Sequence, residues 1–174
     1  YVEGGSLHPT RIDGGTMYRA GGTDLMAPVG EVEFASGVGA MADSGIFGQT
    51  RVCAAIVGFV DLTQGAAVGD VLDAEMIYPR MRGIRYITGW NEDPRLRKPH
   101  MRHRPGLLVD PTFREGLREI ARRGLSFETS VHNHQLPDLA DIARSMPDLT
   151  VIVCHLGGPI GIGKYEGRPK EAFE

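Results

Sequence analysis

The chain has 174 residues, 41% of them hydrophobic and 24% charged, with a formal net charge of −3. This is the ordinary composition of a domain that buries its own core, and the mild negative charge argues against nucleic acid or an anionic membrane as partner. No apolar run approaches the roughly 18 residues that a membrane span needs. Cys53 and Cys154 each lie within an apolar run, which predicts buried free thiols. We therefore expect one cytoplasmic domain over residues 1–174.

The beginning of the chain is rich in glycine. Residues 1–28 contain the sequences GGS, DGG and AGG, which favour a loop region with little regular structure. The first residues, YVEGG, resemble the end of a strand that began earlier, and the last, EAFE, resemble the opening of a helix, so we expect a fragment of a longer protein. A weak helical pattern follows over 31–41, with an apolar stripe at Phe34, Val38 and Met41.

From residue 51 onward, strands and helices alternate. Continuous apolar runs predict buried strands over 51–62, 84–90, 125–131 and 150–154. Helical patterns lie between them, over 70–78, 110–124 and 136–146. Strands that alternate with helices in this way form parallel βαβ units. The predicted class is α/β, either a doubly wound sheet or part of a (β/α)8 barrel.

Two of these helices carry end signals. Asp70 is the expected N-cap of the first, and Asp110 that of the second, where Pro111 suits the first turn. Gly124 is the expected C-terminal stop of the second helix. Its apolar stripe is formed by Phe113, Leu117, Ile120 and Ala121.

Polar residues follow each predicted strand. In both candidate architectures the chemistry lies at the carboxyl ends of the strands. Those ends carry Asp61, then Trp90, Asn91, Glu92 and Asp93, then His132, Asn133 and His134, and finally His155. Because imidazole binds zinc and titrates near neutral pH, histidines in these places are typical of a metal or acid–base site.

Each histidine also has a structural interpretation. His155 is either a site residue or a hydrogen-bonded core residue, and the glycines and proline after it serve either close ligand approach or a tight turn. On an extended strand His132 and His134 point the same way and both reach one ion. We favour the alternative in which only one of the two faces the site and the other is solvated.

Two arginines bracket the start of the second of these strands. Arg85 lies inside the predicted strand, and a buried guanidinium requires a carboxylate or phosphate partner. An acidic substrate and an internal ion pair stay equally open, and Arg82 is a second candidate for the substrate. The cationic loop 95–104 (RLRKPHMRHR) either guides an anion to the site or forms a solvated lid.

A rival motif lies after the last strand. Gly158 to Lys164 matches G-x-x-x-x-G-K, the pattern of a phosphate-binding loop. Tyr165 stands where that loop needs Ser or Thr, and GRP at 167–169 interrupts the helix that must follow. These two departures disfavour a nucleotide-binding protein.

Several motifs together resemble a known family. GEVEFASGVGAMADSGIFG, RVCAAIVGFVDL, RMRGIRYITGWNED and GLSFETSVHNHQLPDLADIARSMPDLTVIVCHLGGPIG are similar to the amidohydrolase-related TIM-barrel hydrolases. The branch they resemble contains predicted metal-dependent hydrolases and sugar or pyrone lactonases. The resemblance covers nearly all of the chain after about residue 28, and the combination of GIR, QLPDL and H-x-GGP is more specific than any one of the three.

The resemblance implies roles for matching residues. His155 of H-x-GGP would be a ligand or acid–base group, Arg85 of GIR would hold a substrate carboxylate, and the segment His132–His134 would line the pocket. The family also uses an H-x-H pair on its first strand and an aspartate on its eighth, and neither lies in these 174 residues. The chain then corresponds to roughly strands two or three to six of a (β/α)8 barrel.

The expected function is hydrolysis of a lactone or amide carbonyl in a small, carboxylate-bearing substrate, with a lactonase as the first candidate. A divalent metal, zinc first, is the expected cofactor, and self-association into a homo-oligomer stays open. The alternatives are a decarboxylase of the same superfamily and an inert truncated barrel. The expected site comprises catalytic His155 and Arg85, substrate-binding Arg82, His132, His134 and Trp90, and the metal ligands His155 and His132.

Overall fold

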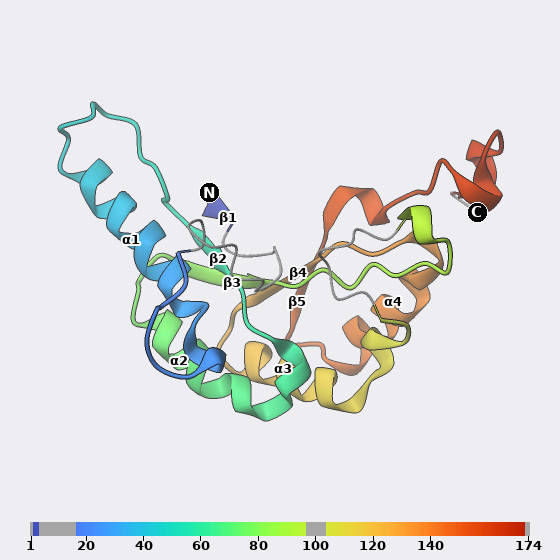
Figure 1. Cartoon of the computed structure of the whole chain (residues 1–174), viewed down its shortest axis with the longest axis horizontal. Coiled ribbons are helices and arrows are strands. Elements are labelled where there is room, and N and C mark those ends of the chain that lie inside the picture. The colour runs from blue at the N-terminus through green and yellow to red at the C-terminus, as the bar shows by residue number, and fades with distance from the viewer. Residues whose placement is uncertain (1, 4–16, 97–103, 173–174) are drawn as a thin grey trace.

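The computed structural model describes residues 2–3, 17–96 and 104–172, which contain five parallel strands and four α-helices (Figure 1). The strands are β1 (Val2–Glu3), β2 (Ile56–Gly58), β3 (Met81–Arg85), β4 (Ser126–Thr129) and β5 (Thr150–Val153). The helices are α1 (Val29–Asp43), α2 (Val68–Met76), α3 (Pro111–Arg122) and α4 (Leu136–Ser145). None of these helices is long and apolar enough to cross a membrane.

The strand order decides between the two architectures that the sequence left open. The sheet runs β1-β2-β3-β4-β5, and every neighbouring pair is parallel. A doubly wound sheet reverses its strand order at a switch point, whereas a barrel wall adds its strands in chain order. Figure 1 shows the helices along one side of the sheet. The α/β prediction is confirmed, and the fold is part of a (β/α)8 barrel.

The strand register separates the core from the opposite face of the sheet. Ile84 of β3 and Phe127 of β4 are register partners, both fully buried in the core beneath the helices. The next pair is Arg85 with Glu128. Because successive side chains alternate between faces, this charged pair leaves the sheet on the side away from that core, which is the inner face of a barrel.

Strand lengths differ from the predictions. β2 covers only 56–58 of the expected 51–62, because Cys53 has a positive φ of 53° before it and Asp61 caps a 3-10 segment after it. β3 begins at Met81 rather than at residue 84. Its pairing continues past Arg85, since the amides of Tyr86 and Thr88 donate to carbonyls of the next strand at 3.0 and 3.2 Å.

The prediction for α3 is confirmed in detail. Asp110 accepts hydrogen bonds from the amides of Thr112 at 2.9 Å and Phe113 at 3.0 Å, and Gly124 follows the helix with φ +66°. The cap predicted for α2 is wrong. Ala67 is the N-cap of α2, and Asp70 lies inside its first turn.

The apolar stripe predicted for α1 is wrong at two of its three positions, since only Val38 packs against the core. Phe34 and Met41 are each 51% exposed, whereas the buried positions are Val29, Gly30, Val32, Ala35, Gly39 and Ala42. The reason is a long-range contact. A Cβ on Gly39 would lie 2.9 Å from Nε of Arg80. At this contact the helix therefore presents a glycine, and not a large residue, to the Arg80 side chain.

Parts of two predicted loops lie outside the described residues, namely 4–16 of the glycine-rich region and 97–103 of the cationic loop. Val2–Glu3 forms β1, in agreement with the interpretation of YVEGG as the end of a strand. Both cysteines are free. Cys53 is buried as predicted, and Cys154 is half-buried because it follows a strand at the edge of the sheet.

Candidate active site

Arg85 and His155 meet at the carboxyl edge of the sheet. Nη2 of Arg85 lies 3.3 Å from Nε2 of His155, although 70 positions separate the two residues. Arg85 is 8% exposed and His155 is exposed. A guanidinium only donates hydrogen bonds, so Nε2 is the acceptor in this contact. The proton of the neutral imidazole then resides on Nδ1.

A carboxylate lies beside this pair. Glu128 of β4 is the register partner of Arg85 and is only 6% exposed. Neighbouring strands are about 5 Å apart, so a carboxylate and a guanidinium from two adjacent strands lie on the side of the sheet where the imidazole arrives from the turn after β5. Such a group can hold an anion and orient a polar substrate at the same time.

The turn after β5 gives His155 its position. His155, Leu156, Gly157 and Gly158 all have positive φ values, of 53°, 54°, 74° and 59°. A non-glycine residue in this region costs about 1–2 kcal/mol. The abrupt turn brings Gly158 onto the exit of β4, where an added Cβ would lie 2.1 Å from the carbonyl oxygen of Val131. Gly158 therefore serves a tight turn packed on backbone, and Gly157 packs on the side chain of Leu136, 3.1 Å from an added Cβ.

Gln135 is a structural residue of the site that the sequence reasoning missed. Its side-chain oxygen accepts from the amides of Trp90 at 2.9 Å and His132 at 3.1 Å, and its nitrogen donates to the Thr88 carbonyl at 3.0 Å. The side chain is 7% exposed. Gln135 thus fastens the exit of β3 to the exit of β4. A glutamine directly before the Leu-Pro that opens α4 was the available signal.

The two histidines of H-x-H do not lie on a strand. β4 ends at Thr129, and residues 133–135 form a 3-10 turn, so the alternation expected of a strand does not apply. The rings of His132 and His134 are nearly parallel, with centroids 6.1 Å apart. His134 lines a cavity, whereas His132 is half-buried against Gly89, whose added Cβ would lie 3.7 Å from Nε2 of His132.

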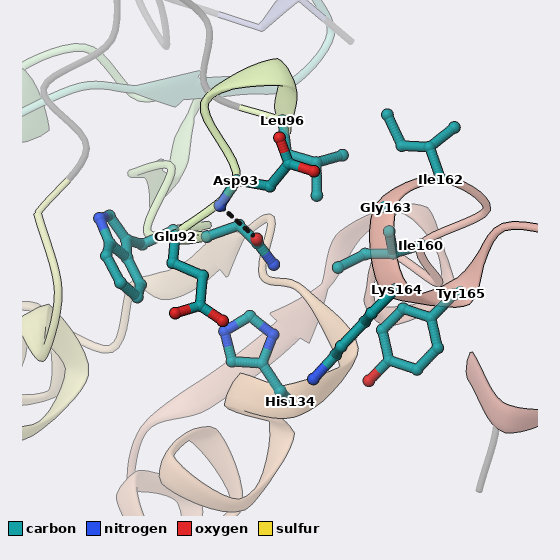
Figure 2. A pocket seen from close by; sticks show the side chains of 11 residues that line it. Glu92, Asp93, Leu96, His134, Ile160, Ile162, Gly163, Lys164 and Tyr165 are labelled. Atoms are coloured by element: carbon teal, nitrogen blue, oxygen red, sulfur yellow. Dashed lines mark hydrogen bonds between the residues drawn. The ribbon is translucent and has the colours of Figure 1, made fainter.

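The cavity has a volume of about 520 Å³ and opens beside the exits of β3 and β4 (Figure 2). Neither Arg85 nor His155 lines it. Its walls are Trp90, Asn91, Glu92, Asp93, Leu96, His134, Ile160, Ile162, Gly163, Lys164 and Tyr165. A volume of this size suits a small molecule. Figure 2 shows the Glu92 carboxylate and the Lys164 ammonium group near the His134 ring.

Burial and nearby charged or polar groups shift the pKa values of two side chains that line this cavity. Burial, followed by the positive charge of Lys164, lowers the pKa of His134, which favours a neutral imidazole. The hydrogen bond from Asn133, 3.3 Å from the hydroxyl oxygen, lowers the pKa of Tyr165, and Lys164 acts in the same direction. The Lys164 ammonium also lies 5.0 Å from the centre of the Tyr165 ring.

Arg82 is not brought to this edge. It is exposed at the amino end of β3, where its guanidinium donates to the carbonyls of Pro79 at 2.8 Å and Met81 at 2.7 Å. The structure therefore separates Arg82 from Arg85, although three positions divide them in the sequence.

The phosphate-loop pattern does not form the corresponding structure. Gly163–Tyr165 is a 3-10 turn, and within the described residues no α-helix follows it. Gly163 has φ +66°, and an added Cβ would lie 2.9 Å from Oδ2 of Asp93. The segment packs on the loop after β3, and Lys164 enters the wall of the cavity.

The proposed metal ligands do not complete a metal centre by themselves. In the part of the chain that the structure describes, no group of three or more His, Cys, Asp or Glu side chains could hold a metal ion. His155 contacts Arg85, and His132 packs with His134. The residues present therefore do not fit a complete zinc site.

Comparison with known proteins agrees with this fold. A family model described as "Amidohydrolase" matches residues 31–174. A protein of Sinorhizobium fredii, printed as uncharacterized protein y4mH, is 33% identical over 150 residues, which are 86% of this chain and 46% of that protein. The chain thus spans about half the length of this relative. No solved structure matches the chain. The sequential parallel sheet, the polar strand ends and the match over 31–174 together show that the chain belongs to the amidohydrolase family.

Proposed function

We propose that the chain is part of a hydrolase that directs water onto the carbonyl carbon of a lactone or amide in a small substrate bearing a carboxylate. Membership of the amidohydrolase family supports the hydrolase class. The observation that carries the finer proposal is the contact between Arg85 and His155 at the carboxyl edge of the sheet.

The two side chains have different tasks in this proposal. Arg85 is a permanent cation on a rigid strand, and its planar donors match the two oxygens of a substrate carboxylate. Because Nε2 of His155 accepts from Arg85, its Nδ1–H is left to donate to the carbonyl oxygen under attack. The substrate is then held at one end and polarised at the other.

The neighbouring residues supply the remainder of the pocket. Trp90 and His134 line the cavity of about 520 Å³, which would take the body of the substrate. A divalent metal, zinc first, remains an expectation, and His155 and His132 are the ligands that this chain would offer. We assign no step to such an ion, since the described residues do not complete a centre for it.

The test is a substrate panel on the complete protein, with lactones and amides in matched versions with and without a carboxylate. A charge-assisted hydrogen bond contributes about 1.5–3 kcal/mol, so Arg85→Met should raise KM roughly 10- to 100-fold for carboxylate substrates and leave KM for the uncharged versions nearly unchanged. Loss of the contact with His155 should lower kcat for both versions alike. His155→Gln should lower kcat for both versions.

Arg82→Met is the matched comparison, since Arg82 lies on the same strand at its opposite end. We expect its KM values to equal those of the unaltered protein. Equal increases in KM for charged and uncharged substrates in Arg85→Met would contradict carboxylate binding. Release of CO2 without hydrolysis of any lactone or amide would identify a decarboxylase instead.

A further inference from the structure

A second group of acidic side chains lies away from the candidate active site, between β2 and the helices. Glu31 comes from the first turn of α1, Glu75 lies near the end of α2, and Tyr18 precedes α1. Glu75 is 0% exposed. A Cβ on Gly58 of β2 would lie 2.8 Å from Oε2 of Glu75. The carboxyl group is therefore packed directly against the backbone of the sheet.

The surroundings of Glu75 are apolar. The same point beside Gly58 is 2.8 Å from the terminal methyl of Met81 and 3.2 Å from a methyl of Val32. Among the described residues, neither carboxyl oxygen of Glu75 has a hydrogen-bond partner, and the same holds for Oε2 of Glu31 and the hydroxyl of Tyr18. A buried carboxylate without a partner is unfavourable, and such a group keeps its proton instead.

The charged groups on the elements packed around Glu75 do not offset the cost of ionising its buried carboxyl group. The cations nearby are engaged elsewhere, with Arg19 bound to Glu33, Arg80 to Asp43, and Arg123 to Asp73 and Glu119. The carboxylate of Asp61, after β2, acts on Tyr18 and adds negative charge, while Asp24 and Asp70 are exposed.

Burial raises the pKa of all three groups, and like charge adds to this effect for Glu75 and Tyr18. Burial raises the pKa of Glu31 to about 7. Burial, followed by the charge of Glu31, raises the pKa of Glu75 well above its usual value. Burial, followed by the charges of Glu31, Glu75 and Asp61, raises the pKa of Tyr18.

We propose that the buried Glu75 and the half-buried Glu31 form a carboxyl pair that holds its protons to a higher pH than exposed glutamates do, and that loss of these protons as the pH rises loosens α1 and α2 from β2. The folded chain holds protons that the unfolded chain has already released above the usual glutamate value of 4.5. The folded state therefore loses stability as the pH rises from about 4.5, and the loss continues until both groups have ionised in the folded chain.

The test is urea unfolding of the complete protein between pH 5 and pH 9, for the unaltered protein, Glu75→Gln and Glu31→Gln. A glutamine keeps the shape of the carboxyl group and cannot ionise. The folded-to-unfolded ratio of Glu75→Gln, relative to the unaltered protein, should rise by up to tenfold for each pH unit in this window. Glu115→Gln, an exposed change on α3, should show no such trend.

A direct readout does not depend on the variants folding. Carbon-13 NMR of the glutamate carboxyl groups in the unaltered protein should show Glu31 titrating near pH 7 and Glu75 titrating well above the usual glutamate value of 4.5. Titration of both near 4.5 would overturn the proposal, as would a constant loss of stability in Glu75→Gln at every pH. Stabilisation at pH 8 by added Mg²⁺ or Ca²⁺, absent in Glu75→Gln, would also overturn it and identify a cation site.

Discussion

Gly158 offers the sharpest test of how the site is built. Its φ is +59°, and an added Cβ would lie 2.1 Å from the Val131 carbonyl oxygen. The left-handed conformation of an alanine costs about 1–2 kcal/mol. Relief of the overlap requires the exits of β4 and β5 to separate, and overpacking of this kind costs about 1–3 kcal/mol. We expect Gly158→Ala to lower the free energy of unfolding by about 2–5 kcal/mol.

Two other glycines after β5 allow the conformational cost to be separated from the cost of overpacking. Gly167 has φ +72° with nothing within 4 Å of an added Cβ, so Gly167→Ala should carry only the conformational cost of about 1–2 kcal/mol. Gly161 has open space and no positive φ, so Gly161→Ala should change stability by about 0.5 kcal/mol or less.

Urea unfolding of the three variants, followed by circular dichroism, measures these differences. The expected order of destabilisation is Gly158→Ala, then Gly167→Ala, then Gly161→Ala. If Gly158→Ala is no worse than Gly167→Ala, the backbone of the β5 exit does not pack on Val131, and the account of the position of His155 fails with it.

Two further predictions concern the strand exits. Gln135→Met removes the hydrogen bonds with Thr88, Trp90 and His132, so urea unfolding should show a loss of about 2–4 kcal/mol; a loss below 0.5 kcal/mol would show that these groups find other partners. His134 should titrate below its ordinary value of 6.5 in proton NMR, because burial and then Lys164 disfavour its charged form. Lys164→Met should move that midpoint upward, and an unchanged midpoint would exclude the electrostatic contribution.

Local signals predicted α3 because everything that defines its ends lies within the helix or next to it. Asp110 binds amides two and three residues ahead, and Gly124 supplies the positive φ after the last turn. The buried face of α1 was mispredicted since it depends on a distant residue. Arg80 packs on Gly39 and forms an ion pair with Asp43, and no periodicity within the helix contains that information.

In the candidate site, too, features set by nearby residues could be predicted, whereas those set by distant residues could not. Position at a strand end singled out His155, and burial of a charged side chain within a strand singled out Arg85. The structure brings the two into contact. The earlier start of β3 brings Arg85 to the carboxyl end of the strand, whereas Arg82 stays at the amino end, away from the site. Gln135 was missed since its partners lie on two different loops, at 88–90 and 132.

The parallel α/β class and most element positions could be predicted from the sequence, because apolar periodicity and end signals act over a few residues. The resemblance to amidohydrolases came from the combination of GIR, QLPDL and H-x-GGP. Only the tertiary structure decided that the strands follow in chain order, and that Arg85, Glu128 and His155 come to one side of the sheet. Those contacts depend on strand register and on loop turns. Register is fixed by the packing of distant segments on one another, so no local pattern specifies it.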